Sequence, residues 1–283
     1  MFTVLSRSLV NTLRTHCQIQ IARNMSIRLF ESSDHAKIYA QFRPDYPDSV
    51  VKTIVNYCKQ CSNDLGLAVD VGCGSGQSTY PLVKYFEKVV GMDVSEKQIE
   101  NGRAKYTDIE FRVGPAEDLA FLDSGSVSLV TVAQAMHWMN HETFYKEVNR
   151  VLKPGGVLAV YGYGLPQENK KEAHAIVLEF YLSLKPYWDK ERKFVEEHYK
   201  SFQLPFPGWI RNDDQEIVKQ WTVDQYIGYI TSWSGWQKLL KDNPESTALQ
   251  KIHEKLSQLY PDDELVTIRW PIFMLLGTKP RDI

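Results

Sequence analysis

Residues 69–78 read VDVGCGSGQS, and this short stretch decides the fold class. An apolar run containing Asp70 is followed at once by glycines at positions 72, 74 and 76. Glycine adopts positive φ angles and lets other groups approach the backbone, so the pattern predicts a strand followed by a loop that wraps a ligand. The dinucleotide fingerprint G-x-G-x-x-G would need a glycine at position 77, where this chain has Gln77. Asp70 would repel the phosphates of a dinucleotide, whereas its charge suits an ammonium group.

Outward from this loop, short apolar runs alternate with helical patterns between residues 67 and 162. Such alternation is typical of a parallel sheet with helices on both faces. The apolar runs predict strands over 67–71, 88–93, 109–113, 127–133 and 156–162, and a closing strand over 267–277. These six runs predict most of a doubly wound α/β domain, and we expect a seven-stranded, mostly parallel sheet whose last strand is antiparallel.

Helix signals lie between these strands. Ser95 and Gln98 form a capping-box pattern that opens a helix reaching about residue 106. A helix over 142–152 is expected to stop at the Lys-Pro-Gly-Gly sequence of 153–156, which would turn the chain into the fifth strand. Pro81 suits the first turn of a helix after the glycine loop.

The pattern changes after residue 164. Residues 167–200 read as two charged helices, residues 201–212 are broken by prolines and a glycine, and residues 223–259 are helical again. We therefore predict a ligand-binding core over 26–164, a helical cap that binds substrate over 165–264, and a closing strand within 265–283.

Composition excludes several classes of protein. The 283 residues carry 33 Lys and Arg against 35 Asp and Glu, so the basic excess typical of nucleic-acid-binding proteins is absent. Four cysteines are too few for a disulfide scaffold and indicate a reducing compartment. Cys58-x-x-Cys61 has no second pair at zinc spacing, so no metal is expected. No apolar run approaches the roughly 18 residues of a membrane span.

The first 30 residues differ in kind, because they contain four arginines and no acidic residue. This composition is typical of a mitochondrial transit peptide, and the alternative is a disordered leader ahead of a second start at Met25. We treat residues 1–25 as a leader outside the fold. We expect a cytoplasmic protein, with the mitochondrial matrix as the alternative location.

Two acidic positions follow the second and third strands. Asp93 closes the second strand 21 residues after Gly72, where a carboxylate can accept hydrogen bonds from a nucleoside ribose. Glu117 and Asp118 follow the third strand, where an adenine ring would lie.

The glycine loop, the ribose acid and the adenine acid in this order resemble the class I S-adenosylmethionine-dependent methyltransferases, over about residues 35–163 and 267–278. More closely, the chain resembles the type 11 subgroup that includes trans-aconitate methyltransferase-like enzymes. The closer match lies in Tyr39-x-x-Phe42-Arg43-Pro44-x-Tyr46-Pro47, Ala135-Met136-His137-Trp138 and Trp221–Trp236. The resemblance implies a Rossmann-like methyltransferase fold, S-adenosylmethionine as cofactor and a small-molecule acceptor.

The resemblance also implies which residues contact the cofactor: Tyr39, Arg43, Asp70, Gly72, Cys73, Gly74, Asp93, Glu117, Asp118, Ala133 and Gln134. Asp70 would organise the loop and face the amino group of the methionine part, which residues 72–74 would wrap. Asp93 would bind the ribose, and residues 117–118 the adenine. Ala133 and Gln134 would line the sulfonium side, and Tyr39 and Arg43 would close over the cofactor.

The sequence says less about which molecule accepts the methyl group. A carboxylate or hydroxyl oxygen is favoured by the resemblance, and C-methylation of a quinone-like ring or a non-catalytic cofactor-binding module are the alternatives. His137 follows the fourth strand, where α/β proteins bind ligands, as a base or hydrogen-bonder; it could equally be structural.

Candidates for binding the substrate are Trp138, Trp233 and Arg211, with Arg269 as a second arginine for an acidic acceptor. Five of the seven tryptophans lie between residues 188 and 236, either as the roof of an apolar pocket or as the core of the cap.

Overall fold

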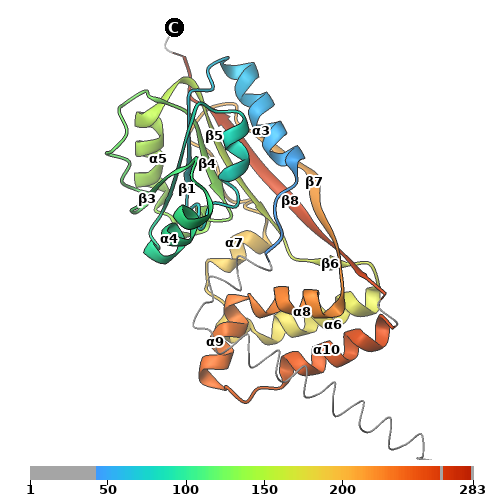
Figure 1. Ribbon diagram of the computed structural model, residues 1–283. Coiled ribbons are helices and arrows are strands. Elements are labelled where there is room, and N and C mark those ends of the chain that lie inside the picture. Colours follow the sequence, from blue (N-terminus) through green and yellow to red (C-terminus); the bar gives the residue numbers. More distant parts are fainter. Residues whose placement is uncertain (1–42, 262–263, 282–283) are drawn as a thin grey trace, which may run out of the picture.

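The computed structural model describes residues 43–261 and 264–281, and its centre is one twisted sheet (Figure 1). Within the described residues the sheet has eight strands in the order β3-β2-β1-β4-β5-β8-β6, and β7 pairs with β8. The bounds are β1 Leu67–Val71, β2 Lys88–Asp93, β3 Glu110–Val113, β4 Val127–Ala133, β5 Leu152–Tyr163, β6 Gln167–Glu168, β7 Ile210–Trp221 and β8 Val266–Thr278. Strands β1 to β5 are parallel, and β8 runs antiparallel to β5, β6 and β7. The predicted doubly wound α/β fold is confirmed.

Helices cover both faces of this sheet. Helices α3 (Asp48–Cys61) and α4 (Glu96–Lys105) pack on one face, and α5 (His141–Val151) packs on the other. Successive residues of β1 alternate between the two faces, so that Ala68 belongs to the first core and Val69 to the second. Both faces of the strand are therefore buried, which explains its continuous apolar sequence.

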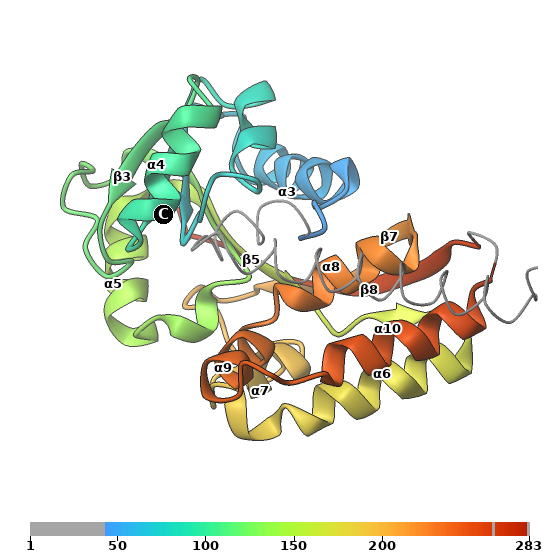
Figure 2. The same ribbon diagram turned by 60° about the horizontal axis from the view of Figure 1, so that its bottom comes forward.

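The cap consists of five helices beyond the carboxyl ends of β1 to β5: α6 (Lys171–Ser183), α7 (Arg192–Glu196), α8 (Val223–Thr231), α9 (Ser234–Asp242) and α10 (Ala248–Leu259). Figure 2 shows α6 and α10 lying side by side beneath the long strand β8. A capping box opens α8, because the Thr222 hydroxyl accepts from the Gln225 amide while the Gln225 side chain accepts from the Thr222 amide.

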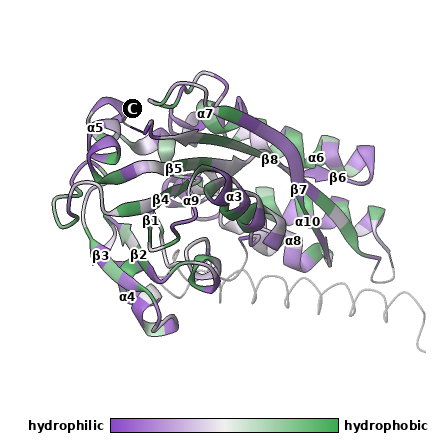
Figure 3. Cartoon of the chain, turned by 90° about the horizontal axis from the view of Figure 1, so that it is seen from above, coloured by the Kyte–Doolittle hydropathy of each residue, from purple (hydrophilic) through white to green (hydrophobic). Residues whose placement is uncertain are grey.

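Three local expectations differ from the structure. After the glycine loop, Tyr80–Lys84 forms a short 3₁₀ helix (η1) rather than an α-helix. Residues 153–156 lie inside β5, where Gly155 has φ 81° and the pairing with β4 shifts register, rather than forming a separate turn. Strand β7 lies in the range predicted as helical cap. Only Ile217 of its twelve residues is buried, and much of it is hydrophilic in Figure 3, so no apolar run marks it.

Residues 1–25, with their predicted leader and location, and Tyr39 lie outside the described residues. The boundaries proposed for core and cap stay predictions. Among the helices that the structure describes, none combines the length and the apolar character needed to cross a bilayer.

Candidate active site

The glycine loop (residues 72–78) leaves β1 through three residues with positive φ: 72° at Gly72, 54° at Gly74 and 88° at Gly76. A Cβ at Gly72 would lie 2.6 Å from the Ala135 Cβ, and one at Gly76 would lie 2.7 Å from the Phe111 ring. A Cβ at Gly74 would meet nothing within 4 Å. Packing inside the protein therefore explains the first and third glycines, whereas the second faces open space that a ligand can occupy.

Asp70 lies fully buried beneath this loop. Its carboxylate accepts hydrogen bonds from the hydroxyls of Ser78 (2.9 Å), Thr79 (2.6 Å) and Thr131 (2.7 Å). Burial raises the pKa of Asp70, and the three hydroxyl donors oppose that rise. Asp70 thus ties the far end of the loop, at Ser78 and Thr79, to β1 and β4. Because its side chain has no exposed surface, it does not face a ligand amino group in this arrangement, contrary to our expectation.

Asp93, at the end of β2, lies beside the loop and is only partly buried. Its Oδ2 accepts from the amide of Gly74 at 2.9 Å, and its Oδ1 accepts from the amide of Ser95 at 2.8 Å. A carboxylate offers about four acceptor positions, so both oxygens can still accept hydroxyl protons from a ribose. The next residue, Val94, is 70% exposed and leaves an apolar surface on which a flat ring can pack.

One cavity, here called the loop cavity, brings many of the predicted residues together. It is lined by Arg43, Pro44, Asp45, Tyr46, Gly72, Cys73, Gly74, Ser75, Gln77, Ser78, Ala133, Gln134 and Tyr163. Sequence reasoning assigned no role to Tyr46 or Tyr163. Tyr163 could have been found from its position, because it ends β5 at the edge of the sheet where α/β proteins bind ligands.

A second, wider cavity, here called the edge cavity, has a volume of about 460 Å³ and lies at the carboxyl end of β3. Gly114 and Asp118 line it, together with Arg112 and Phe121. The Gly114 amide donates to the backbone oxygen of Asp93 at 3.0 Å, so Asp93 connects the two cavities. Glu117 does not line this cavity, and its carboxylate accepts from the Asn140 amide at 2.7 Å.

Gln134 directly follows β4 and has a φ of 56°, an unusual conformation for a residue with a side chain. Its side-chain amide donates to the Tyr163 oxygen and accepts from the Tyr163 amide, both at 3.0 Å. Gln134 thereby replaces the next pair of backbone bonds in the β4–β5 ladder. The Tyr163 hydroxyl then accepts from the Arg43 guanidinium at 2.9 Å, and that guanidinium lies 5.9 Å from the centre of the Tyr229 ring.

His137 lies outside the lining of the loop cavity. Its Nδ1 is 2.7 Å from the Tyr199 hydroxyl, in the segment that follows α7. Burial, with a smaller contribution from Arg192, lowers the pKa of His137 to about 4. The histidine therefore joins the core to the cap as a neutral ring, which favours its structural alternative. Its neighbour Trp138 is 59% exposed.

The remaining substrate candidates also lie away from the cavity. Arg211 donates to Asp213 at 2.8 Å and to the His198 oxygen at 2.7 Å, and Arg269 pairs with Glu216 on the exposed face of β7 and β8. Trp233 is buried in an aromatic cluster formed by Phe180, Tyr181, Trp188, Trp233 and Trp236. The tryptophans of this cluster are therefore core rather than the roof of a pocket.

Comparison with known proteins identifies the family. A family model described as a methyltransferase domain matches residues 69–160. A Dictyostelium discoideum protein named "Putative methyltransferase" is 36% identical over 251 residues, which cover 86% of this chain and 93% of that protein. This chain belongs to the class I S-adenosylmethionine-dependent methyltransferases. Like them, it is an enzyme that uses S-adenosylmethionine as its cofactor.

Two further relatives of this methyltransferase match over most of their length. A "Probable S-adenosylmethionine-dependent methyltransferase" of Saccharomyces cerevisiae is 26% identical, with 85% of this chain and 94% of that protein covered. The solved structure of a "Putative Type II Methyltransferase" from Anaeromyxobacter dehalogenans is 31% identical, with a TM-score of 0.74 and coverage of 85% of this chain and 100% of that one. The open space at Gly74 and the Asp93 carboxylate, which can accept hydrogen bonds from ribose hydroxyls, fit the cofactor of this family.

Proposed function

We propose that this methyltransferase transfers the methyl group to an oxygen of a small molecule, with a carboxylate favoured over a hydroxyl. The observation that carries the proposal is the Arg43 guanidinium, which lines the loop cavity beside Ala133 and Gln134. A guanidinium binds a carboxylate through two parallel hydrogen bonds and orients it as a plane. The Tyr163 hydroxyl, which accepts from Arg43, supports that orientation. The closer resemblance to trans-aconitate methyltransferase-like enzymes stays a prediction.

We further propose how the cofactor lies. The methionine part would occupy the loop cavity between residues 72–74 and 133–134, and the ribose would bind Asp93. The adenine would reach the loop that follows β3. The support for this placement is the position of Asp93, whose carboxylate bonds to Gly74 of one cavity and whose backbone bonds to Gly114 of the other.

The bound cofactor supplies an activated methyl group on a good leaving group. The chain then has to align the acceptor with that methyl and exclude water, and alignment of this kind lowers a barrier by roughly 7–11 kcal/mol at most. A carboxylate acceptor is already ionised at neutral pH and needs no general base. The position of His137 against Tyr199 rather than in the loop cavity is consistent with such an acceptor.

The test is a screen with methyl-labelled S-adenosylmethionine against pools of small organic acids, phenols and quinones. A base-labile labelled product, which is the mark of a methyl ester, is expected. A base-stable product would show methylation of carbon, nitrogen or ether oxygen and would contradict the carboxylate. Cofactor binding without labelling of any pool would favour a non-catalytic module.

Arg43→Gln tests the role of the guanidinium once an acceptor is found. The KM for the acceptor should rise by about 10- to 100-fold, as expected for the loss of a charge-assisted hydrogen bond of roughly 1.5–3 kcal/mol. Affinity for S-adenosylhomocysteine, whose own carboxylate would lie in the same cavity, is measured in parallel and should change less; a larger loss there than in the acceptor KM would assign Arg43 to the cofactor. Arg269→Gln is the matched control, because Arg269 pairs with Glu216 outside the cavity. An unchanged KM in Arg43→Gln would remove Arg43 from the acceptor site.

A further inference from the structure

The loop between β3 and β4 is bonded to one helix, α5, from Glu117 to Gly125. At the amino end of the helix, the Asn140 amide donates to Glu117 at 2.7 Å. In the middle, Glu147 accepts from the Leu119 amide at 3.0 Å. At the carboxyl end, the Arg150 oxygen accepts from the Gly125 amide at 2.9 Å. Gly114 is bonded to Asp93 of β2, whereas the part of the loop that carries Asp118 takes its position from α5.

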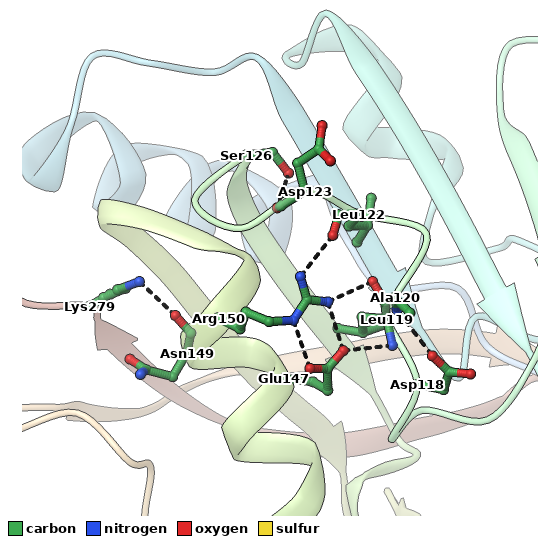
Figure 4. A network of polar contacts seen from close by, with 10 residues as sticks. All are labelled: Asp118, Leu119, Ala120, Leu122, Asp123, Ser126, Glu147, Asn149, Arg150 and Lys279. Atoms are coloured by element: carbon green, nitrogen blue, oxygen red, sulfur yellow. Dashed lines mark hydrogen bonds and ion pairs between the residues drawn. The ribbon is translucent and has the colours of Figure 1, made fainter.

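The centre of this attachment is the pair Glu147 and Arg150 (Figure 4). The Arg150 guanidinium donates twice to the Glu147 carboxylate, both times at 2.8 Å. It also donates to the Leu122 oxygen at 2.8 Å and to the Leu119 oxygen at 2.9 Å. The Arg150 guanidinium thus binds a carboxylate and two loop carbonyls. The same carboxylate accepts a hydrogen bond from the Leu119 amide of the loop.

The environment strengthens these contacts. The side chains of Arg150 and Glu147 are only 32% and 22% exposed, and Leu119, which belongs to the loop, is fully buried. The hydrogen bonds from Arg150 lower the pKa of Glu147, so the pair stays charged at neutral pH. The pair Glu142–Lys146 on the same helix is a natural contrast, because its side chains are 81% and 73% exposed.

We propose that Glu147 and Arg150 are positioning residues for the recognition of adenine: they hold the loop after β3 rigid so that residues 114–118 distinguish adenine from other purines. The proposal rests on the cofactor placement given above. Adenine presents an amino donor and a ring acceptor, whereas hypoxanthine of the same shape presents a carbonyl acceptor and an N–H donor. Loop groups that are held in place discriminate between these edges, and groups that can rotate or shift adapt to both.

The experiment measures binding of S-adenosylhomocysteine and S-inosylhomocysteine by calorimetry to the full chain. The variants are Glu147→Gln and Arg150→Lys, and Lys146→Met is the matched control on the same helix. The wild type and the control should prefer the adenine ligand. In both variants affinity for S-adenosylhomocysteine should fall about tenfold, which is about 1.4 kcal/mol, while affinity for S-inosylhomocysteine changes less. The ratio of the two affinities therefore falls.

Thermal unfolding of each variant identifies a general loss of structure. Equal weakening of both ligands, with the ratio kept, would overturn the proposal and leave the pair a purely structural role. Equal binding of the two ligands by the wild type would also overturn it, because this loop would then not distinguish adenine from hypoxanthine. Neither result bears on the proposed acceptor, which is tested by the labelled product.

Discussion

The glycine loop and the aromatic cluster of the cap are both marked by unusual residue types, yet the loop lines a cavity whereas the cluster packs as core. In the loop, three glycines with positive φ shape the backbone, and the buried Asp70 binds three hydroxyls beneath it. In the cluster, Trp233 is buried and contacts Tyr181 and the partly buried Trp188. The difference teaches that backbone conformation is encoded locally, whereas the direction an aromatic side chain faces depends on distant partners.

Trp233→Ala should show the largest effect on folding. Removing a buried tryptophan costs about 3–5 kcal/mol of unfolding free energy, because the cavity left behind is only partly refilled. Urea denaturation measures this loss, and affinity of the folded protein for S-adenosylhomocysteine should not change. Trp138→Ala, at a residue that is 59% exposed, is the matched control and should be nearly neutral for stability. If Trp233→Ala were as stable as the wild type and had a raised KM for the methyl acceptor, Trp233 would instead be a residue that binds the acceptor.

Asp93→Ala tests the loop side of the comparison. Affinity for S-adenosylhomocysteine should fall by roughly 1.5–3 kcal/mol, the value of a hydrogen bond to a charged group. Calorimetry gives the dissociation constant, and Asp108→Asn, at an exposed position of the same domain, serves as the control. If affinity stayed at the wild-type value, Asp93 would not bind the ribose.

His137 allows a test in which pH is the variable. Its pKa of about 4 lies below the ordinary value of 6.5, so the folded state disfavours the charged ring. The contribution to stability is complete above pH 6.5 and is lost as the pH falls toward 4. Between pH 7.5 and pH 5 the wild type should lose about 2 kcal/mol of unfolding free energy through this group. In His137→Gln that part of the loss should be absent in denaturation curves; an identical pH dependence would place the ring in solvent.

Gly74→Ala should have a smaller effect on folding than Trp233→Ala. A residue with a side chain at this positive φ costs about 1–2 kcal/mol, and no protein atom lies within 4 Å of the added methyl group. Because the methyl group enters the space assigned to the cofactor, S-adenosylhomocysteine binding should nevertheless be lost. Gly72→Ala is the comparison, since its methyl group would meet Ala135 and disturb the fold itself. Normal cofactor binding by Gly74→Ala would contradict the proposed placement.

Much of the sheet was predictable because its strands are apolar and bounded by turn residues. The predicted bounds of β1, β2 and β4 agree with the structure to the residue, and Ser95 caps α4 by accepting from the Gln98 amide, which is one half of the expected capping box. Strand β7 was not predictable, because its pairing partner β8 lies far along the chain and its own residues are mostly polar. The position of Tyr163 at the end of β5 was predictable, but the bonds that its backbone makes with the Gln134 side chain were not.

Sequence alone determined the parallel core, the glycine loop after β1 and the position of Asp93, because strand periodicity and glycine φ preferences act over a few neighbouring residues. Tertiary structure alone decided that Asp70 is buried under its loop, that His137 binds Tyr199 in the cap, and that Arg150 holds the loop after β3. Each of these roles depends on contacts between residues far apart in the chain, such as the 62 positions between His137 and Tyr199. Such contacts are set by packing and burial of the whole chain rather than by local pattern.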